Sequence, residues 1–234
     1  MKAKLLLYLF IGFYSLSNLA QTTKTFNTPG TETFTVPPGV TEISIEAWGG
    51  GGRGGSAGSN PAGGGGSGAY SKSTKSVSEN DEFSITVGEG GRLVQTGPFA
   101  FEIRDGKQSK VTDDNSNSIV LAEGGNSVGG SNTTSGATGG QATNGFATGT
   151  PSDKVDGIDG LNGSTLNSGK GGDAFNGGSG GASVNTDNDG KPGVAPGGGG
   201  SGAAASSNST VFYNGGDGGN GQVKITFTEF TFTQ

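Results

Sequence analysis

Glycine dominates the body of this chain, and its spacing restricts the possible folds more than any other feature. The sequence has 51 glycines in 234 residues, and residues 49–68 alone hold twelve of them. Elsewhere glycine recurs at every third position, as at Gly157, Gly160 and Gly163. A period of three is typical of polyproline-II-type helices, which make no internal hydrogen bonds. An ordered body therefore requires neighbouring segments that pair with the outward-pointing N–H and C=O groups.

Energy alone does not decide whether such a body is ordered. Ordering each glycine costs about 0.5–1 kcal/mol more than ordering an alanine, or roughly 25–50 kcal/mol over some fifty glycines. Backbone hydrogen bonds contribute about 1 kcal/mol each, which is a comparable total. The sequences that flank the glycine-rich body are needed to decide the question, and they favour order.

The segment Val40–Trp48 has the pattern of a half-buried strand. From Ile43 onward apolar and polar residues alternate strictly, with Ile43, Ile45 and Ala47 on one face and Ser44 and Glu46 on the other. This period of two predicts one buried and one exposed face. A shorter strand over 33–36 precedes it, and Pro-Pro-Gly between the two indicates a turn.

The C-terminal segment mirrors this pattern. Val223, Ile225 and Phe227 alternate with polar residues, and Phe230 and Phe232 continue the series. Half-buried strands need a partner and a covered face, so we expect the two ends of the chain to pair or to stack in one sandwich.

Weaker strand patterns occur inside the glycine-rich body, and no window of this region has the 3.6-residue apolar period of a helix. The sequence thus predicts an all-β fold with no α-helix after the N-terminal leader. The weaker strand candidates are Ala69–Val77, Glu82–Val87, Phe99–Arg104, Ser109–Thr112, Ser118–Ala122 and Thr210–Tyr213.

The N-terminus has the pattern of a signal peptide. Lys2 and Lys4 precede an apolar run over 5–16, which is too short to span a bilayer. Cleavage is expected after Ala20, so residues 1–20 form the signal peptide and residues 21–234 a single glycine-rich β domain. A retained signal anchor is the alternative. With no cysteine after the apolar run, attachment of a lipid to a new N-terminal cysteine is excluded.

Composition excludes several classes of function. Residues 21–234 have 12 basic and 20 acidic residues, a net charge of −8, so neither nucleic acid nor an anionic membrane surface is an expected partner. The chain has no cysteine and no histidine, which removes thiolate nucleophiles, zinc sites of the Cys/His type and imidazole catalysis. The Gly-x-Gly-x-x-Gly spacing at 197–202 follows no apolar strand, so no dinucleotide or other cofactor is expected.

Several carboxylates and Trp48 have side chains of the kinds that occur in binding sites. Asn185, Asp187 and Asp189 resemble the start of a calcium loop, but Pro196 stands where the last carboxylate is needed; whether they bind calcium stays open, with a solvated turn as the alternative. Asp156, Asp159 and Asn162 share the glycine period and are expected to form a polar edge. Trp48 is expected to pack on glycine rather than on a sugar. No catalytic, cofactor-binding or metal-binding residue is identified, and the ligand-binding residues are unknown.

Several of these motifs together resemble the bacterial and phage glycine-rich domain family. They are Phe34-Thr35-Val36-Pro37-Pro38-Gly39-Val40, the strand that ends in Ala47-Trp48 before Gly49–Gly52, Thr86-Val87-Gly88-Glu89-Gly90-Gly91, and Gly218-Gly219-Asn220-Gly221-Gln222-Val223-Lys224-Ile225. The resemblance covers most of residues 25–228. It implies a jelly-roll-like β-sandwich that brackets a bundle of polyglycine-II helices, similar to that in phage tail-fibre tip adhesins and bacterial surface proteins.

The sequence as a whole predicts a non-enzymatic adhesive or structural protein, exported to the cell surface or the extracellular space. Its expected partner is a surface receptor, a glycan or a surface-protein complex, bound through loops on the glycine-rich scaffold. No membrane span is expected after the signal peptide is cleaved. A carbohydrate-binding module or lectin is one alternative, and an ice-binding protein is another.

Overall fold

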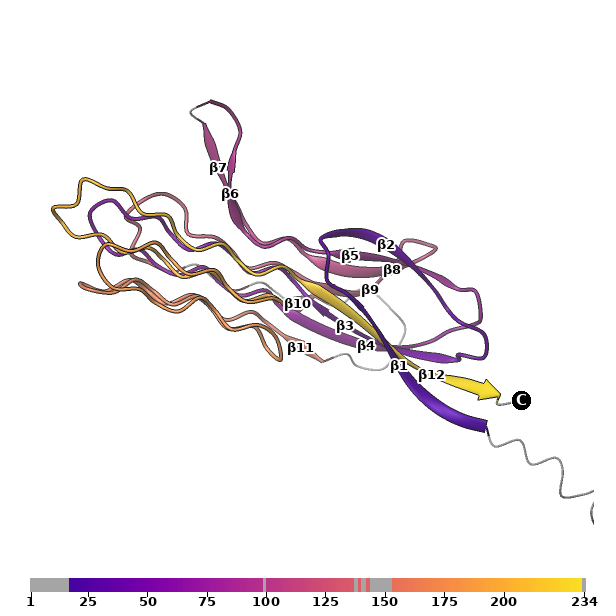
Figure 1. Ribbon diagram of the computed structural model, residues 1–234. Helices are drawn as coiled ribbons and strands as arrows, with labels where there is room; N and C mark the ends of the chain where they lie inside the picture. The colour runs from indigo at the N-terminus through magenta and orange to yellow at the C-terminus, as the bar shows by residue number, and fades with distance from the viewer. Residues whose placement is uncertain (1–16, 99, 137–138, 140–141, 144–152, 233–234) are drawn as a thin grey trace, which may run out of the picture.

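The computed structural model describes residues 17–98, 100–136, 139, 142–143 and 153–232 (Figure 1). These residues form strands, turns and extended segments, and none of them forms a helix that could cross a membrane. The first sheet has five strands in the order β1 (Ser17–Phe26), β12 (Gln222–Phe232), β3 (Glu42–Trp48), β4 (Tyr70–Ser76) and β11 (Lys154–Val155). The second has five in the order β10 (Ala142–Thr143), β9 (Ser118–Ala122), β8 (Ser109–Asp113), β5 (Glu82–Val87) and β2 (Gly30–Thr35).

The two sheets enclose a single apolar core. In the central strands alternate residues point inward, as in β3, where Ile43, Ile45 and Ala47 are fully buried. The second sheet contributes Phe83 and Ile85 among others, and the core cluster includes residues of both sheets. The predicted all-β sandwich is therefore confirmed.

The expected pairing of the two ends of the chain is also confirmed. Strand β12 lies between β1 and β3 and pairs antiparallel with both. Ile225 lies opposite Ile45, so the two alternating patterns place their apolar residues on the same inward face. Strands from both ends of the chain thus lie side by side in the first sheet, and the glycine-rich segments extend from this sheet.

Beside the sandwich, the glycine-rich segments run as an elongated bundle of extended, undulating chains (Figure 1). Segment 49–57 shows how they are joined, because its successive amides donate to different neighbours. One set of hydrogen bonds runs from Gly49, Gly52 and Gly55 to the carbonyls of Ala69, Gly66 and Gly63. A second set runs from Gly51, Gly54 and Ala57 to the carbonyls of Gly219, Gly216 and Tyr213. Both sets advance three residues at a time, which is the pairing expected of a polyglycine-II lattice.

At the edges of the bundle, side-chain oxygens take the place of neighbouring carbonyls. Asn162 Oδ1 accepts a hydrogen bond from Gly136 N, and Asp159 Oδ1 accepts one from Gly139 N, both at 2.8 Å. The polar edge predicted from the three-residue spacing therefore has a structural role, because its side chains satisfy amides that would otherwise lack a protein partner.

Most of the weaker strand predictions are confirmed, with two differences. The strand predicted to begin at Phe99, which lies outside the described residues, is β7 (Phe101–Arg104), and it pairs with the unpredicted β6 (Arg92–Gln95). The strand predicted over Thr210–Tyr213 is wrong. Only Tyr213 makes a bridge, to Ala57, because residues 206–212 form a loop at the end of the bundle.

Glu46 points away from the core as predicted, but it is not a free surface residue. Its Oε1 accepts a hydrogen bond of 2.7 Å from the hydroxyl of Tyr70, a residue that is 3 % exposed. Burial and this contact with Glu46 raise the pKa of Tyr70 well above its ordinary value.

This raised pKa predicts a loss of stability in alkali. Because the folded protein holds Tyr70 in its neutral form, the contribution is complete below the ordinary tyrosine pKa of about 10 and is lost as the pH rises above it. We expect the free energy of unfolding to fall from about pH 10 upward, and Tyr70→Phe to weaken that dependence. Urea unfolding from pH 8 to 11.5 measures it; identical pH slopes in the two proteins would contradict the assignment.

Candidate functional site

A groove of about 920 Å³ lies between the β6–β7 hairpin and the glycine bundle. The hairpin projects from the molecule beside the bundle, so it forms one wall of the groove (Figure 1). The opposite wall and the floor come from Asp189, Gly190, Pro192, Phe212 and residues 214–217, together with Arg53 and Ser56. The volume is within the range of small-molecule and glycan sites.

The walls of the groove are apolar and unusually accessible. Phe101, on β7, is 61 % exposed, and Phe212, in the loop at the end of the bundle, is 56 % exposed. Leu93 and Ile103 of the hairpin complete this apolar lining. Large apolar side chains left in water around one concave surface indicate a place where another molecule binds.

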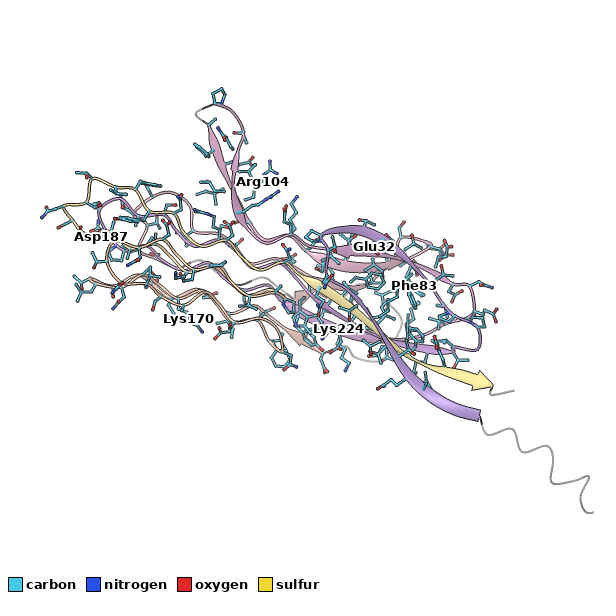
Figure 2. All side chains as sticks on the ribbon, in the orientation of Figure 1. Glu32, Phe83, Arg104, Lys170, Asp187 and Lys224 are labelled. Carbon is cyan, nitrogen blue, oxygen red and sulfur yellow. The ribbon has the colours of Figure 1, made fainter. Side chains whose placement is uncertain are left out.

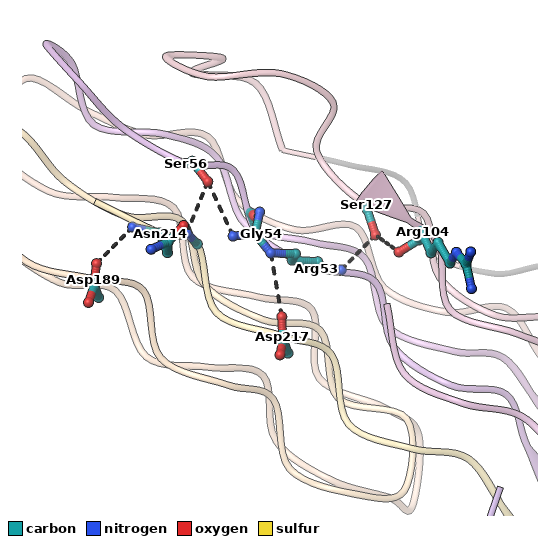
Figure 3. Close-up of polar contacts among 9 residues, drawn as sticks. Arg53, Gly54, Ser56, Arg104, Ser127, Asp189, Asn214 and Asp217 are labelled. Atoms are coloured by element: carbon teal, nitrogen blue, oxygen red, sulfur yellow. Dashed lines mark hydrogen bonds and ion pairs between the residues drawn. The ribbon is translucent and has the colours of Figure 1, made fainter. Parts of the chain in front are cut away.

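The floor of the groove contains a buried cation. Arg53 is 1 % exposed, and its guanidinium donates hydrogen bonds to Gly54 O and to Ser56 Oγ at 3.0 and 3.2 Å (Figure 3). Its Nε lies 3.4 Å from Oδ1 of Asp217, whose side chain is 59 % exposed. Burial lowers the pKa of Arg53, and the charge of Asp217 opposes this change.

Carboxylates give the groove its polar character. Asp189 and Asp217 both line it, and Asp189 Oδ1 accepts a hydrogen bond of 2.7 Å from Asn214 N. Among the described residues of the lining Arg53 is the only cation, so the charges of Arg53, Asp189 and Asp217 sum to −1. The groove thus combines apolar walls with hydrogen-bond acceptors, which suits a neutral or cationic ligand that carries donor groups.

Ser127 holds the base of the hairpin against the bundle. Its hydroxyl accepts a hydrogen bond from Arg53 N at 2.8 Å and donates to the carbonyl of Arg104, the last residue of β7, at 2.9 Å (Figure 3). The position of one wall of the groove therefore depends on this side chain.

We expect Ser127→Ala to lower the free energy of unfolding by about 1–3 kcal/mol, because it leaves a buried amide and a carbonyl without their partner. Ser207→Ala, at an exposed serine, is the matched control and should change stability by about 0.5 kcal/mol or less. Thermal or urea unfolding measures both. Equal stabilities of the two variants would show that Ser127 does not hold the hairpin.

The proposed calcium residues lie at the far end of the bundle, where Figure 2 labels Asp187. Asp187 Oδ1 accepts a hydrogen bond from Ser206 N at 3.0 Å, and Asn185 Oδ1 accepts one from Asn188 Nδ2 at 2.9 Å. The contacts of Asp187 with Ser206 and of Asp189 with Asn214 join neighbouring loops, whereas Asn185 bonds within its own loop. Among the described residues no group of three or more acidic side chains could hold a metal ion.

Trp48 lies beside a glycine segment, as the sequence predicts, because a Cβ on Gly177 would lie 3.1 Å from its Cδ1. It is 2 % exposed, and its indole N–H donates a hydrogen bond of 2.8 Å to the carbonyl of Phe175. Its ring lies 5.1 Å from that of Tyr70, centroid to centroid, and Lys224 Nζ lies 5.0 Å from its centroid. A buried indole cannot stack on a sugar, so the accessible aromatics are those of the groove and the loops.

The sequence did not point to the groove. Phe101 and Phe212 are 111 positions apart in the chain, and nothing in their local patterns links them. Arg53 follows four glycines and has no distinguishing motif. Contacts between distant parts of the chain, such as those of Ala57 with Tyr213 and of Arg53 with Ser127, bring these residues to one surface.

Sandwich and lattice together define a class of all-β scaffold in which a two-sheet sandwich is extended by a bundle of hydrogen-bonded glycine segments. The family model of the glycine-rich domain matches residues 25–228. The chain therefore belongs to the glycine-rich domain family, and the resemblance found in its motifs is confirmed. No curated protein matches it.

Proposed function

We propose that this chain is an exported protein of the cell surface or extracellular space, which binds a surface partner through the groove and the loops at the end of the glycine bundle. The observation that carries the proposal is the set of exposed apolar residues held on a hydrogen-bonded scaffold. Phe101 and Phe212 line the groove, and Leu166 and Val211 are 67 % and 54 % exposed in neighbouring loops.

The loops are well suited to recognition because they are tied to one another. Asn167 pairs with Asn185, Asn188 pairs with Ala204, and Thr186 donates a hydrogen bond to the carbonyl of Leu166. Loops with fixed ends lose less conformational entropy on binding than free loops. The signal-peptide pattern of the N-terminus, Lys2 and Lys4 before the apolar run over 5–16, supports export of the protein.

The test begins with fractionation of the producing cells and identification of whatever co-purifies with the protein. Phe101→Ser combined with Phe212→Ser should then lower the affinity for that partner at least tenfold without changing the melting temperature. Leu161→Ser is the control, since Leu161 is 60 % exposed but does not line the groove. Unchanged binding by the double variant would contradict a role of the groove.

Carbohydrate binding is the second candidate, and the chemistry of the groove favours it. Accessible aromatic faces next to the carboxylates of Asp189 and Asp217 could stack on a sugar ring and accept its hydroxyl hydrogens. A glycan array separates the two functions. Retention of one glycan class by the wild type and not by the Phe101→Ser, Phe212→Ser variant supports a lectin, and no retention at all supports a protein partner.

A further inference from the structure

Among the described residues, the outer end of β12 pairs with one strand, β1. Residues 223–227 of β12 lie between β1 and β3, and the pairing of β3 with β12 ends at Phe227, opposite Ile43. Beyond that point β12 pairs with β1 alone, as a two-stranded ribbon that leaves the sandwich at the end opposite the glycine bundle (Figure 1). The register of this ribbon places Ala20 opposite Glu229 and Ser17 opposite Phe232.

The expected cleavage site falls inside this ribbon. Removal of residues 1–20 takes away the partner of residues 229–232 and leaves Gln21, opposite Thr228, as the first residue of β1. In the part of the chain that the structure describes, residues 229–232 then have no strand on either side. An unpaired strand presents free N–H and C=O groups to any other strand.

The sequence of the freed segment favours pairing over disorder. Glu229-Phe230-Thr231-Phe232 contains aromatic and β-branched residues, which have high strand propensity, and only one charge. The strand removed by cleavage ran antiparallel to β12. A second copy of the segment can take its place in the same direction, with a twofold axis between residues 230 and 231.

We infer that signal-peptide cleavage creates a self-complementary strand edge at residues 229–232, through which two copies of the processed chain pair. In this register Glu229 of one copy lies opposite Phe232 of the other, so the two carboxylates do not face each other. This antiparallel contact pairs the free strand edge of both copies at once, so no further copy can add to it and the assembly stops at a dimer. Because only four residues pair on each side, the contact is small and the dimer is weak.

A dimer formed through the ribbons would carry two binding ends. The ribbon and the groove lie toward opposite ends of the molecule (Figure 1), so a dimer joined through the ribbons directs its two bundles away from each other. Two binding ends on one particle raise the avidity for a surface with many receptors. The inference rests on the export part of the proposed function and not on the identity of the partner.

The test compares two forms of the chain by sedimentation equilibrium over a wide concentration range. A chain that starts at Gln21 should pass from one to two protomers as its concentration rises, and the amides of 229–232 should gain protection from hydrogen exchange in parallel. A chain that starts at Ser17 keeps residues 17–20 paired with residues 229–232, and it should stay monomeric.

Phe230→Pro combined with Thr231→Pro provides the matched variant. Successive amides of a strand point to opposite edges, so one of the two prolines removes a donor from the pairing edge whichever edge is used. The double variant should stay monomeric with an unchanged melting temperature. Monomers of the Gln21 chain at every concentration, a dimer that survives both prolines, or an exported protein that retains residues 17–20 would each overturn the inference. Groove binding measured on the monomer tests the proposed function separately.

Discussion

Replacing Gly51 or Gly199 by valine is expected to destabilise the protein by about 3 kcal/mol or more, the sum of overpacking and lost backbone pairing. A Cβ on Gly51 would overlap the carbonyl of Gly198, and one on Gly199 would overlap the carbonyl of Gly65. These obstacles are backbone atoms of neighbouring segments, which cannot rotate away as a side chain can. The lattice would have to separate, which breaks hydrogen bonds on both sides.

The control is another glycine of the same region. A Cβ on Gly129 would meet no atom within 4 Å, and this residue does not have a positive φ. Gly129→Ala should therefore leave stability unchanged or raise it by about 0.4–1 kcal/mol through a smaller entropy of the unfolded chain. Urea unfolding of the three variants compares them directly. If all three glycines tolerate substitution equally, the glycine-rich body is not a packed lattice.

A second large effect is expected in the sandwich. Ile45→Asp and Ile225→Asp should each cost more than about 4 kcal/mol, because each places a carboxylate in an apolar core where it finds no partner. Both residues are 0 % exposed, and they lie opposite each other in β3 and β12. Circular dichroism and thermal melting should show an unfolded or barely folded chain.

The matched change is Thr226→Asp, on the outward face of β12 next to Ile225. Its side chain is half-buried, and it contacts the Thr23 hydroxyl at 3.1 Å. We expect a loss of about 1 kcal/mol or less. If this variant is as damaging as Ile225→Asp, the assignment of inward and outward faces is wrong.

Local patterns were sufficient to predict the sandwich. The alternation of Ile43, Ile45 and Ala47 gives the inward face of β3 directly, and Val223, Ile225 and Phe227 do the same for β12. A period of two carries this information because it needs no knowledge of the partner strand. For the same reason, the four-residue β6, which follows two glycines and has no strict alternation, was not predicted.

The glycine spacing predicted the kind of pairing but not the partners. A period of three says that neighbours must accept hydrogen bonds, and segment 49–57 does bond to 63–69 and to 213–219. Which segments become neighbours is decided by contacts between parts of the chain far apart in sequence. The groove depends on those contacts, so Arg53, Phe101 and Phe212 could not be recognised as one site beforehand.

The hydrogen-bond partners of the polar residues in the glycine-rich body could not be predicted from the sequence. Asp159, Asn162 and Asp187 each match the pattern of a solvated turn or edge, yet each accepts a backbone hydrogen bond from a neighbouring segment. Glu46 was expected to be freely exposed, and it bonds to Tyr70 instead. These contacts depend on the three-dimensional position of the donor, which no local pattern encodes.

Hydrogen exchange of the backbone amides in segment 49–57 tests the central claim most directly, that the glycine-rich body is an ordered lattice which holds the groove in place. Each of the amides of Gly50, Gly51 and Gly52 donates to a different neighbour. We predict that they exchange about as slowly as the amides of β3 and β12, because only a large-scale opening exposes them. Exchange of these amides at the rate of an unfolded chain, with β3 and β12 still protected, would contradict the lattice and leave the sandwich as the only folded part.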